Sequence, residues 1–240
     1  MNKLLRNSVA ALFVAGAAAA HADPFTITSQ LTGDPRIANP DNLIVDVTIT
    51  GNTTSNTVSW LFDINSPLHP NTKLDEFYFN VLGLGSNYSF SSFIPLGWSY
   101  NTPASPQGGG NFVSTFLFEI LDPAGPPNAA DVTNTQDLTF EMTKTNGLFT
   151  TADFTSALAP CSSDTVLGCG QLGAHLQSLT VAAGSGLSDS GFALGRYVYT
   201  PPCTVNCGSG DNPIPEPGTL ALFGFGLLGL GVTRKVRLWT

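Results

Sequence analysis

Apolar and polar side chains alternate along much of the chain between residues 45 and 142. In five stretches an aliphatic or aromatic residue recurs at about every second position and polar residues fill most of the gaps: 45–49, 58–64, 77–81, 112–120 and 138–142. A period of two places one row of side chains against a core and the other row in water. The pattern therefore predicts half-buried β-strands.

Residues that favour turns separate these stretches. Gly, Pro and Asn gather at residues 51–52, 67–71, 103–111, 123–128 and 146–147. No window of about twelve residues keeps a helical period, and only residues 151–158 predict one or two helical turns. About eight strands joined by long polar loops predict an all-β domain, a two-sheet antiparallel sandwich that is jelly-roll-like.

The N-terminus has the three parts of a secretory signal. Lys3 and Arg6 form a basic region, residues 9–20 form an apolar run, and Ala20 and Ala22 place small side chains at positions −3 and −1 of a cleavage site. We predict a signal peptide over residues 1–22, export through the secretion machinery, and cleavage after Ala22 by signal peptidase. The alternative is an N-terminal membrane anchor, but a membrane-spanning helix needs about 20 apolar residues.

The C-terminus also has three parts. Pro215, Glu216 and Pro217 precede an uncharged run over residues 218–233, and the basic residues Arg234, Lys235 and Arg237 follow it. As a helix the run would cover roughly 24 Å, close to the hydrocarbon core of a bilayer. We predict a transmembrane segment over residues 218–233, which the basic residues stop from crossing the membrane.

Residues 215–240 closely resemble the PEP-CTERM sorting signal in the order of their three parts. The resemblance implies that an exosortase-type transpeptidase recognises the Pro-Glu-Pro motif and removes the tail. It also implies that the exported protein lies transiently in the inner membrane and then reaches the cell surface or extracellular matrix. The alternative is a C-terminal anchor that is never processed. Residues 174–177 and 190–192 loosely resemble part of the family's ectodomains, which implies a β-sandwich.

Between the two terminal signals we place a sandwich over residues 23–199 and a Pro-, Gly- and Cys-rich stalk over residues 200–214. Residues 23–217 contain all 17 Asp and Glu of the chain against four Lys and Arg, which gives a net charge of −13. This charge excludes electrostatic binding to nucleic acid. Carboxylates suit Ca²⁺, but a solvated acidic surface explains the same composition.

The four cysteines lie late in the chain, and export favours their pairing as disulfides. Three connectivities are possible. We favour Cys161–Cys169 and Cys203–Cys207, because each pair closes a short loop rich in Ser, Gly or Asn. The spacing of Cys203 and Cys207 also occurs in zinc sites, but these need a second such pair or histidines, and only His175 lies near in the sequence. We therefore predict no metal site.

The sequence contains no recognisable catalytic motif, and we expect no cofactor and no catalytic residue. His69 lies between prolines and is interpreted as an exposed loop residue, while His175 is interpreted as a packed residue that starts a strand. Two carboxylate pairs, Asp75 with Glu76 and Glu119 with Asp122, have the residue types that glycoside hydrolysis requires. Nothing in their sequence context marks them as catalytic.

Three hypotheses for function remain. The family resemblance favours a non-enzymatic surface or matrix protein that associates with exopolysaccharide in a biofilm. The first alternative is a carbohydrate- or Ca²⁺-binding jelly-roll module, with Trp98 and Tyr100 as an exposed aromatic platform. The second alternative is a secreted hydrolase whose site has no recognisable motif.

Overall fold

The computed structural model describes residues 22–33, 43–104, 116–123, 129–161, 169–181, 183 and 189–201. They belong to one compact unit that ends at Pro201. Strands account for most of its regular structure, and every pairing between them is antiparallel. The all-β, antiparallel prediction is confirmed.

The described strands form one sheet of eleven strands. What we call the β3 half contains, in order, β5 (Tyr88–Ile94), β8 (Leu138–Lys144), β3 (Thr57–Ile64), β2 (Leu43–Asn52) and β1 (Pro24–Gly33). The β4 half continues with β10 (Gly191–Gly195), β9 (Leu172–Gln177), β4 (Lys73–Phe79), β7 (Phe118–Leu121) and β6 (Ser99–Asn101). The short strand β11 (Val198–Tyr199) pairs with β1.

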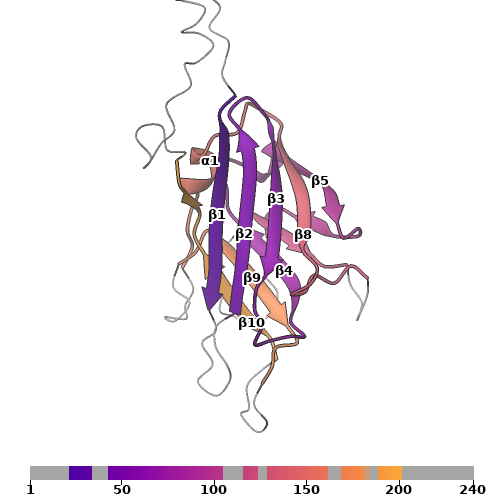
Figure 1. Ribbon diagram of the computed structural model, residues 1–240. Helices are drawn as coiled ribbons and strands as arrows, with labels where there is room; N and C mark the ends of the chain where they lie inside the picture. The colour runs from indigo at the N-terminus through magenta and orange to yellow at the C-terminus, as the bar shows by residue number, and fades with distance from the viewer. Residues whose placement is uncertain are drawn as a thin grey trace, which may run out of the picture. The chain divides into compact units, whose positions relative to one another are not determined.

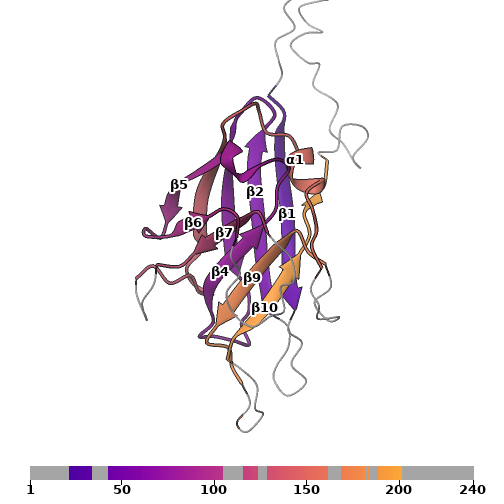
Figure 2. The same ribbon diagram turned by 180° about the vertical axis from the view of Figure 1, so that it is seen from behind.

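Strand β1 joins the two halves. It pairs with β2 along its whole length, while its other edge meets β10 only where Thr32 lies opposite Leu194 and meets β11 at Ile27 and Thr28. The sheet turns at this junction, so that the β4 half lies behind the β3 half in Figure 1 and in front of it in Figure 2. The pairing is continuous and does not divide into the two separate sheets that the sequence suggested.

An aromatic core fills the space between the halves. Alternate residues of β1, β2 and β3 are buried, as a period of two predicts. The ring of Trp60 on β3 lies 5.9 Å from that of Phe77 and 4.6 Å from that of Phe79, both on β4. Because each aromatic ring buries a large apolar area, these contacts hold the two halves together.

A second, smaller cluster lies apart from this core and contains Tyr78, Ala104, Phe116 and Leu194. Tyr78 follows Phe77 on β4 and so points to the outer face of the β4 half. Phe116 stacks on its ring at 5.7 Å, and the backbone N–H of Ala104 donates to the carbonyl of Phe116 at 3.2 Å. The chain beside β6 and β7 therefore shields part of this outer face from water.

Helices are short in the described residues. The 3₁₀ helix η1 spans Gly85–Asn87, and α1 spans Ala152–Thr155, which confirms one helical turn within residues 151–158. Asp153 stabilises that turn because its carboxylate accepts from the Thr150 N–H at 2.8 Å and pairs with Lys144 at 2.7 Å. None of the described helices has the length and apolar character needed to cross a membrane. The transmembrane segment predicted over residues 218–233 lies outside the described residues.

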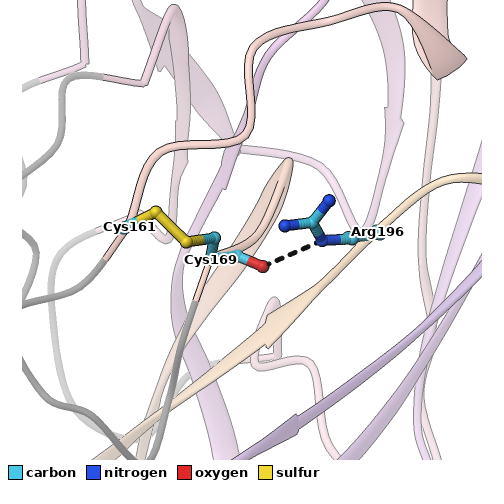
Figure 3. Close-up of a disulfide and its surroundings, with 3 residues drawn as sticks. All are labelled: Cys161, Cys169 and Arg196. Carbon is cyan, nitrogen blue, oxygen red and sulfur yellow. Dashed lines mark hydrogen bonds between the residues drawn. A yellow bond between two sulfur atoms is a disulfide. The ribbon is translucent and has the colours of Figure 1, made fainter.

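One of the two predicted disulfides is present in the described residues. Cys161 and Cys169 are bonded, and they also pair as an isolated β-bridge. Figure 3 shows the side chain of Arg196 beside this disulfide, where its Nε donates to the Cys169 carbonyl at 3.2 Å. Cys203 and Cys207 lie outside the described residues, so their pairing stays a prediction.

Candidate functional site

Three ionisable side chains meet on the outer face of the β4 half. Leu74, Phe77 and Ala174 belong to the main core, so Glu76 on β4 and His175 on β9 point to the opposite face, where they lie directly across from each other. The Nδ1 atom of His175 lies 2.8 Å from Oδ2 of Asp75 and 3.6 Å from Oε2 of Glu76. We call Asp75, Glu76 and His175 the outer triad.

A β-bulge brings both carboxylates to the histidine. The pairing of β4 with β9 shifts between Leu74, which faces Leu176, and Glu76, which faces His175. Asp75 is the extra residue. In a regular strand neighbouring side chains point to opposite faces, but a bulge redirects one of them, so Asp75 and Glu76 both reach His175.

Neighbouring side chains fix the orientation of the triad. The hydroxyl of Tyr78 donates to Oε2 of Glu76, and the nearby side chain of Gln177 helps to lower the pKa of Asp75. Phe192 on β10 stacks on the imidazole with ring centroids 4.5 Å apart. The three ionisable groups are therefore held in place by contacts from three adjacent strands.

The carboxylates determine the protonation of His175. Burial alone would disfavour the imidazolium, but attraction to Asp75 and then to Glu76 outweighs it and raises the pKa of His175 from 6.5 to about 9. The contact with His175 lowers the pKa of Asp75, against the opposing effect of burial. At neutral pH the triad thus contains an imidazolium beside two carboxylates. The 2.8 Å contact is a close ion pair, although Nδ1 makes no hydrogen bond of regular geometry within the described part of the chain.

Further charges lie beside the triad. The N–H of Asp122, directly after β7, donates to the Asp75 carbonyl at 3.1 Å, and Lys73 pairs with Asp131 at 2.6 Å. Burial, and then the charges of Asp131 and Asp75, raise the pKa of Asp122 from 3.8 to about 6. With Glu76, four carboxyl groups therefore surround two cationic groups, Lys73 and His175, and the local potential favours cations.

The raised pKa predicts that the fold loses stability in mild alkali. Because the pKa of His175 is about 9 in the folded protein against an ordinary value of 6.5, its contribution is complete below pH 6.5 and is lost as the pH rises to 9. The loss should be about 2 kcal/mol, since one pKa unit is worth about 1.4 kcal/mol and solvent screening reduces the total. Urea unfolding between about pH 6 and pH 9.5, with EDTA present, measures it. His175→Gln should flatten the profile, and an unchanged slope in that variant would contradict the assignment.

Residues 213–235 match the family model described as the PEP-CTERM protein-sorting motif. The chain therefore carries a PEP-CTERM sorting motif. The motif implies export, membrane-anchored sorting and processing by exosortase. The matched residues include Pro215, Glu216, Pro217, Arg234 and Lys235. No curated protein and no solved structure is detectably similar to the chain.

Most of the other predicted positions lie outside the described residues. They are the signal-cleavage residue Ala20, the sorting residues Pro215, Glu216 and Pro217, and the basic residues Arg234, Lys235 and Arg237, whereas Ala22 is the first described residue and is exposed. The cleavage position and the residue roles within the sorting signal stay predictions.

Two interpretations of single residues were wrong. His69 is buried rather than exposed, because its Nδ1 accepts the N–H of Thr180 at 3.1 Å and its carbonyl accepts from Asn134 at 3.0 Å. Trp98 is also buried, with Nε1 donating to the Ala130 carbonyl at 2.9 Å, so it cannot serve in an exposed aromatic platform. Tyr100 stays partly exposed, with its ring 4.6 Å from that of Phe90.

The structure brings the two predicted carboxylate pairs onto neighbouring strands. Glu119 on β7 is opposite Tyr78 and accepts from Asn101 at 3.2 Å, whereas Asp75 and Glu76 are engaged with His175. His175 lies within β9 rather than at its start. Sequence reasoning missed the triad, because nothing local connects residue 175 with residues 75 and 76.

A groove lies on the outer face of the β3 half. It has a volume of about 430 Å³, and hydroxyl or carboxylate side chains on β2, β3, β5 and β8 contribute to its lining: Thr48, Thr50, Ser59, Ser92, Thr139 and Glu141. Leu61 and Ile94 add exposed apolar surface to the same groove. The Ser92 hydroxyl donates to Glu141 at 3.0 Å across the pair β5–β8.

Proposed function

We propose that the mature protein is a non-enzymatic component of the extracellular polysaccharide layer, delivered there by exosortase. The sorting motif at residues 213–235 carries this proposal, because a removable membrane tail serves a protein that acts outside the cytoplasmic membrane. After removal of both terminal signals, the body would keep the 17 acidic and four basic residues of residues 23–217. Mutual repulsion between such bodies favours solubility at the cell surface.

In this proposal the strand-rich unit is a scaffold of two packed layers. We propose that these layers form a jelly-roll-like sandwich whose two sheets are linked through β1, since the contacts of Trp60 with Phe77 and Phe79 hold the β3 and β4 halves face to face. The disulfide between Cys161 and Cys169 suits an exported scaffold, because it persists in an oxidising environment.

Carbohydrate binding is the second candidate function, and the groove on the β3 half favours it. Hydroxyl and carboxylate groups lie beside the apolar side chains of Leu61 and Ile94. A sugar ring has matching hydroxyl groups and apolar C–H faces. With Trp98 buried, this groove replaces the aromatic platform as the surface to test. A Thr139→Arg substitution would fill it with a long charged side chain.

Fractionation of the native host's extracellular matrix tests the proposal. We expect the protein to co-purify with polysaccharide, to be released when the polysaccharide is digested, and to start at Asp23 with its tail removed, as intact-mass analysis would show. Thr139→Arg should weaken retention if the groove binds sugar and leave it unchanged if the body is held otherwise. Recovery of the protein only in the cell-free medium would overturn its placement in the polysaccharide layer, and shortening of the polysaccharide by purified protein would overturn the non-enzymatic assignment.

A further inference from the structure

We propose that the outer triad of Asp75, Glu76 and His175 binds a divalent transition-metal ion, with Zn²⁺ as its representative. The three side chains offer one imidazole nitrogen and two carboxylate oxygens, all within 4.8 Å of one another. Zinc binds such groups at about 2.0 to 2.2 Å, so two ligands in a tetrahedral arrangement lie about 3.4 Å apart. The distances of 2.8 and 3.6 Å from Nδ1 to the two oxygens lie on either side of that value.

A second observation concerns Nδ1 of His175 itself. The side chain is nine-tenths buried, with an exposed fraction of 10%, and Nδ1 faces both carboxylates without a hydrogen bond of regular geometry to either. A buried nitrogen in that position is costly unless something satisfies it. A metal ion between Nδ1 and the two oxygens would satisfy all three atoms. Without a metal ion, the imidazolium of His175 is the counter-ion of the two carboxylates.

The surroundings meet the further requirements of a metal site. Ligands of a bound metal are oriented by hydrogen bonds from neighbouring groups, and here the hydroxyl of Tyr78 donates to Glu76. The side chain of Asp75 is 32% exposed, against 9% for Glu76, so an ion can approach from the Asp75 side. The charges of Asp122 and Asp131 favour a cation there, and Lys73 is paired with Asp131.

The donor set decides which class of metal fits. Ca²⁺ and Mg²⁺ prefer oxygen ligands, whereas imidazole suits zinc and other transition metals. Three protein ligands leave room for water at a fourth position. Both carboxylates depend on the bulge at Asp75, since a regular strand would turn one of them to the core.

Zn²⁺ titration of the exported protein, treated with EDTA and dialysed, tests the site. We expect one Zn²⁺ bound at the triad, and binding of Co²⁺ with the visible absorption of a site containing nitrogen and oxygen ligands. Asp75→Asn, which keeps the side-chain volume at a partly exposed position, should lower the affinity about tenfold or more, and His175→Ala should abolish binding. An excess of Ca²⁺ should not displace Zn²⁺.

Matched controls separate Zn²⁺ binding at the triad from non-specific binding to other acidic residues. Asp63 lies beside Asp137 and Asp46 with no histidine among the groups that shift its pKa, so Asp63→Asn should leave Zn²⁺ binding unchanged. Circular dichroism confirms that each variant is folded, and Asp75→Asn with Tyr78→Phe still tests the site if His175→Ala does not fold. The proposal is wrong if wild-type protein binds no Zn²⁺, or if binding survives Asp75→Asn but disappears when Cys203 and Cys207 are replaced. Neither result depends on where the protein is sorted.

Discussion

Replacing Glu216 with alanine should leave nearly all of the protein, at full length, in the cytoplasmic membrane. If exosortase recognises Pro215, Glu216 and Pro217, the substitution removes the charged residue of the motif and prevents cleavage. The predicted apolar segment over residues 218–233 and the basic residues behind it would still hold the chain in the bilayer. Wild-type protein should instead appear outside the membrane without residues 218–240.

Membrane fractionation and immunoblotting in the native host measure this effect. Asp211→Ala is the matched control, because it removes a nearby carboxylate that lies outside the matched residues 213–235 and should be processed like wild type. Equal, full-length retention of wild type and Glu216→Ala would refute processing and favour a permanent anchor. Release of both would show that Glu216 is not recognised.

Replacing Trp60 with alanine should cost about 3 to 5 kcal/mol of the free energy of unfolding. The side chain is 2% exposed, and its ring stacks on Phe140 of the β3 half while touching Phe77 and Phe79 of the β4 half. The substitution would leave a large cavity where the halves meet. Since a typical domain is stable by only about 5 to 15 kcal/mol, this loss should expose much of the protein to unfolding and proteolysis.

Urea unfolding of the exported protein gives the comparison. Leu61→Ala is the control, because Leu61 is the next residue on the same strand but is 37% exposed on the outer face. This substitution should lower the free energy of unfolding by only about 0.5 kcal/mol. Trp60→Phe should be intermediate, since Nε1 of Trp60 has no hydrogen-bond partner among the described residues and only ring volume is lost. A loss below about 1 kcal/mol for Trp60→Ala would show that these contacts do not hold the halves together.

Together the two substitutions test separate parts of the molecule. Glu216→Ala should change location without changing the stability of the strand-rich unit, since residue 216 lies beyond its end at Pro201. Trp60→Ala should lower stability without altering recognition of the sorting signal. A single-site change that affected both would show that sorting requires the folded body.

Local patterns were sufficient for what depends on neighbouring residues. The alternation at residues 45–49 and 58–64 predicted β2 and β3, because the side-chain period of a strand is a property of its own backbone. Cys161 and Cys169 are eight residues apart, so their pairing follows from a short loop. The sorting motif is a fixed order of residues within one short stretch, 213–235, so it is visible without a fold.

Strands whose residues do not alternate clearly were missed, because alternation was the evidence for a strand. β6 has three residues, all exposed, and β10 contains two glycines, so neither shows a clear alternation. They are strands because β7 and β9 supply their hydrogen-bond partners. The contribution of tertiary context to strand formation is larger than that of intrinsic preference.

The sequence by itself determined the all-β type of fold, the short-range disulfide and the sorting motif at residues 213–235, and it predicts the N-terminal signal peptide. Only the tertiary structure decided which side chains meet. It joined the halves through β1, buried His69 and Trp98, and placed His175 against Asp75 and Glu76 through a bulge in β4. Alternation specifies which face of a strand is apolar, but it does not specify the partner strand or the register. Those depend on the packing of residues that lie 100 positions apart in the chain.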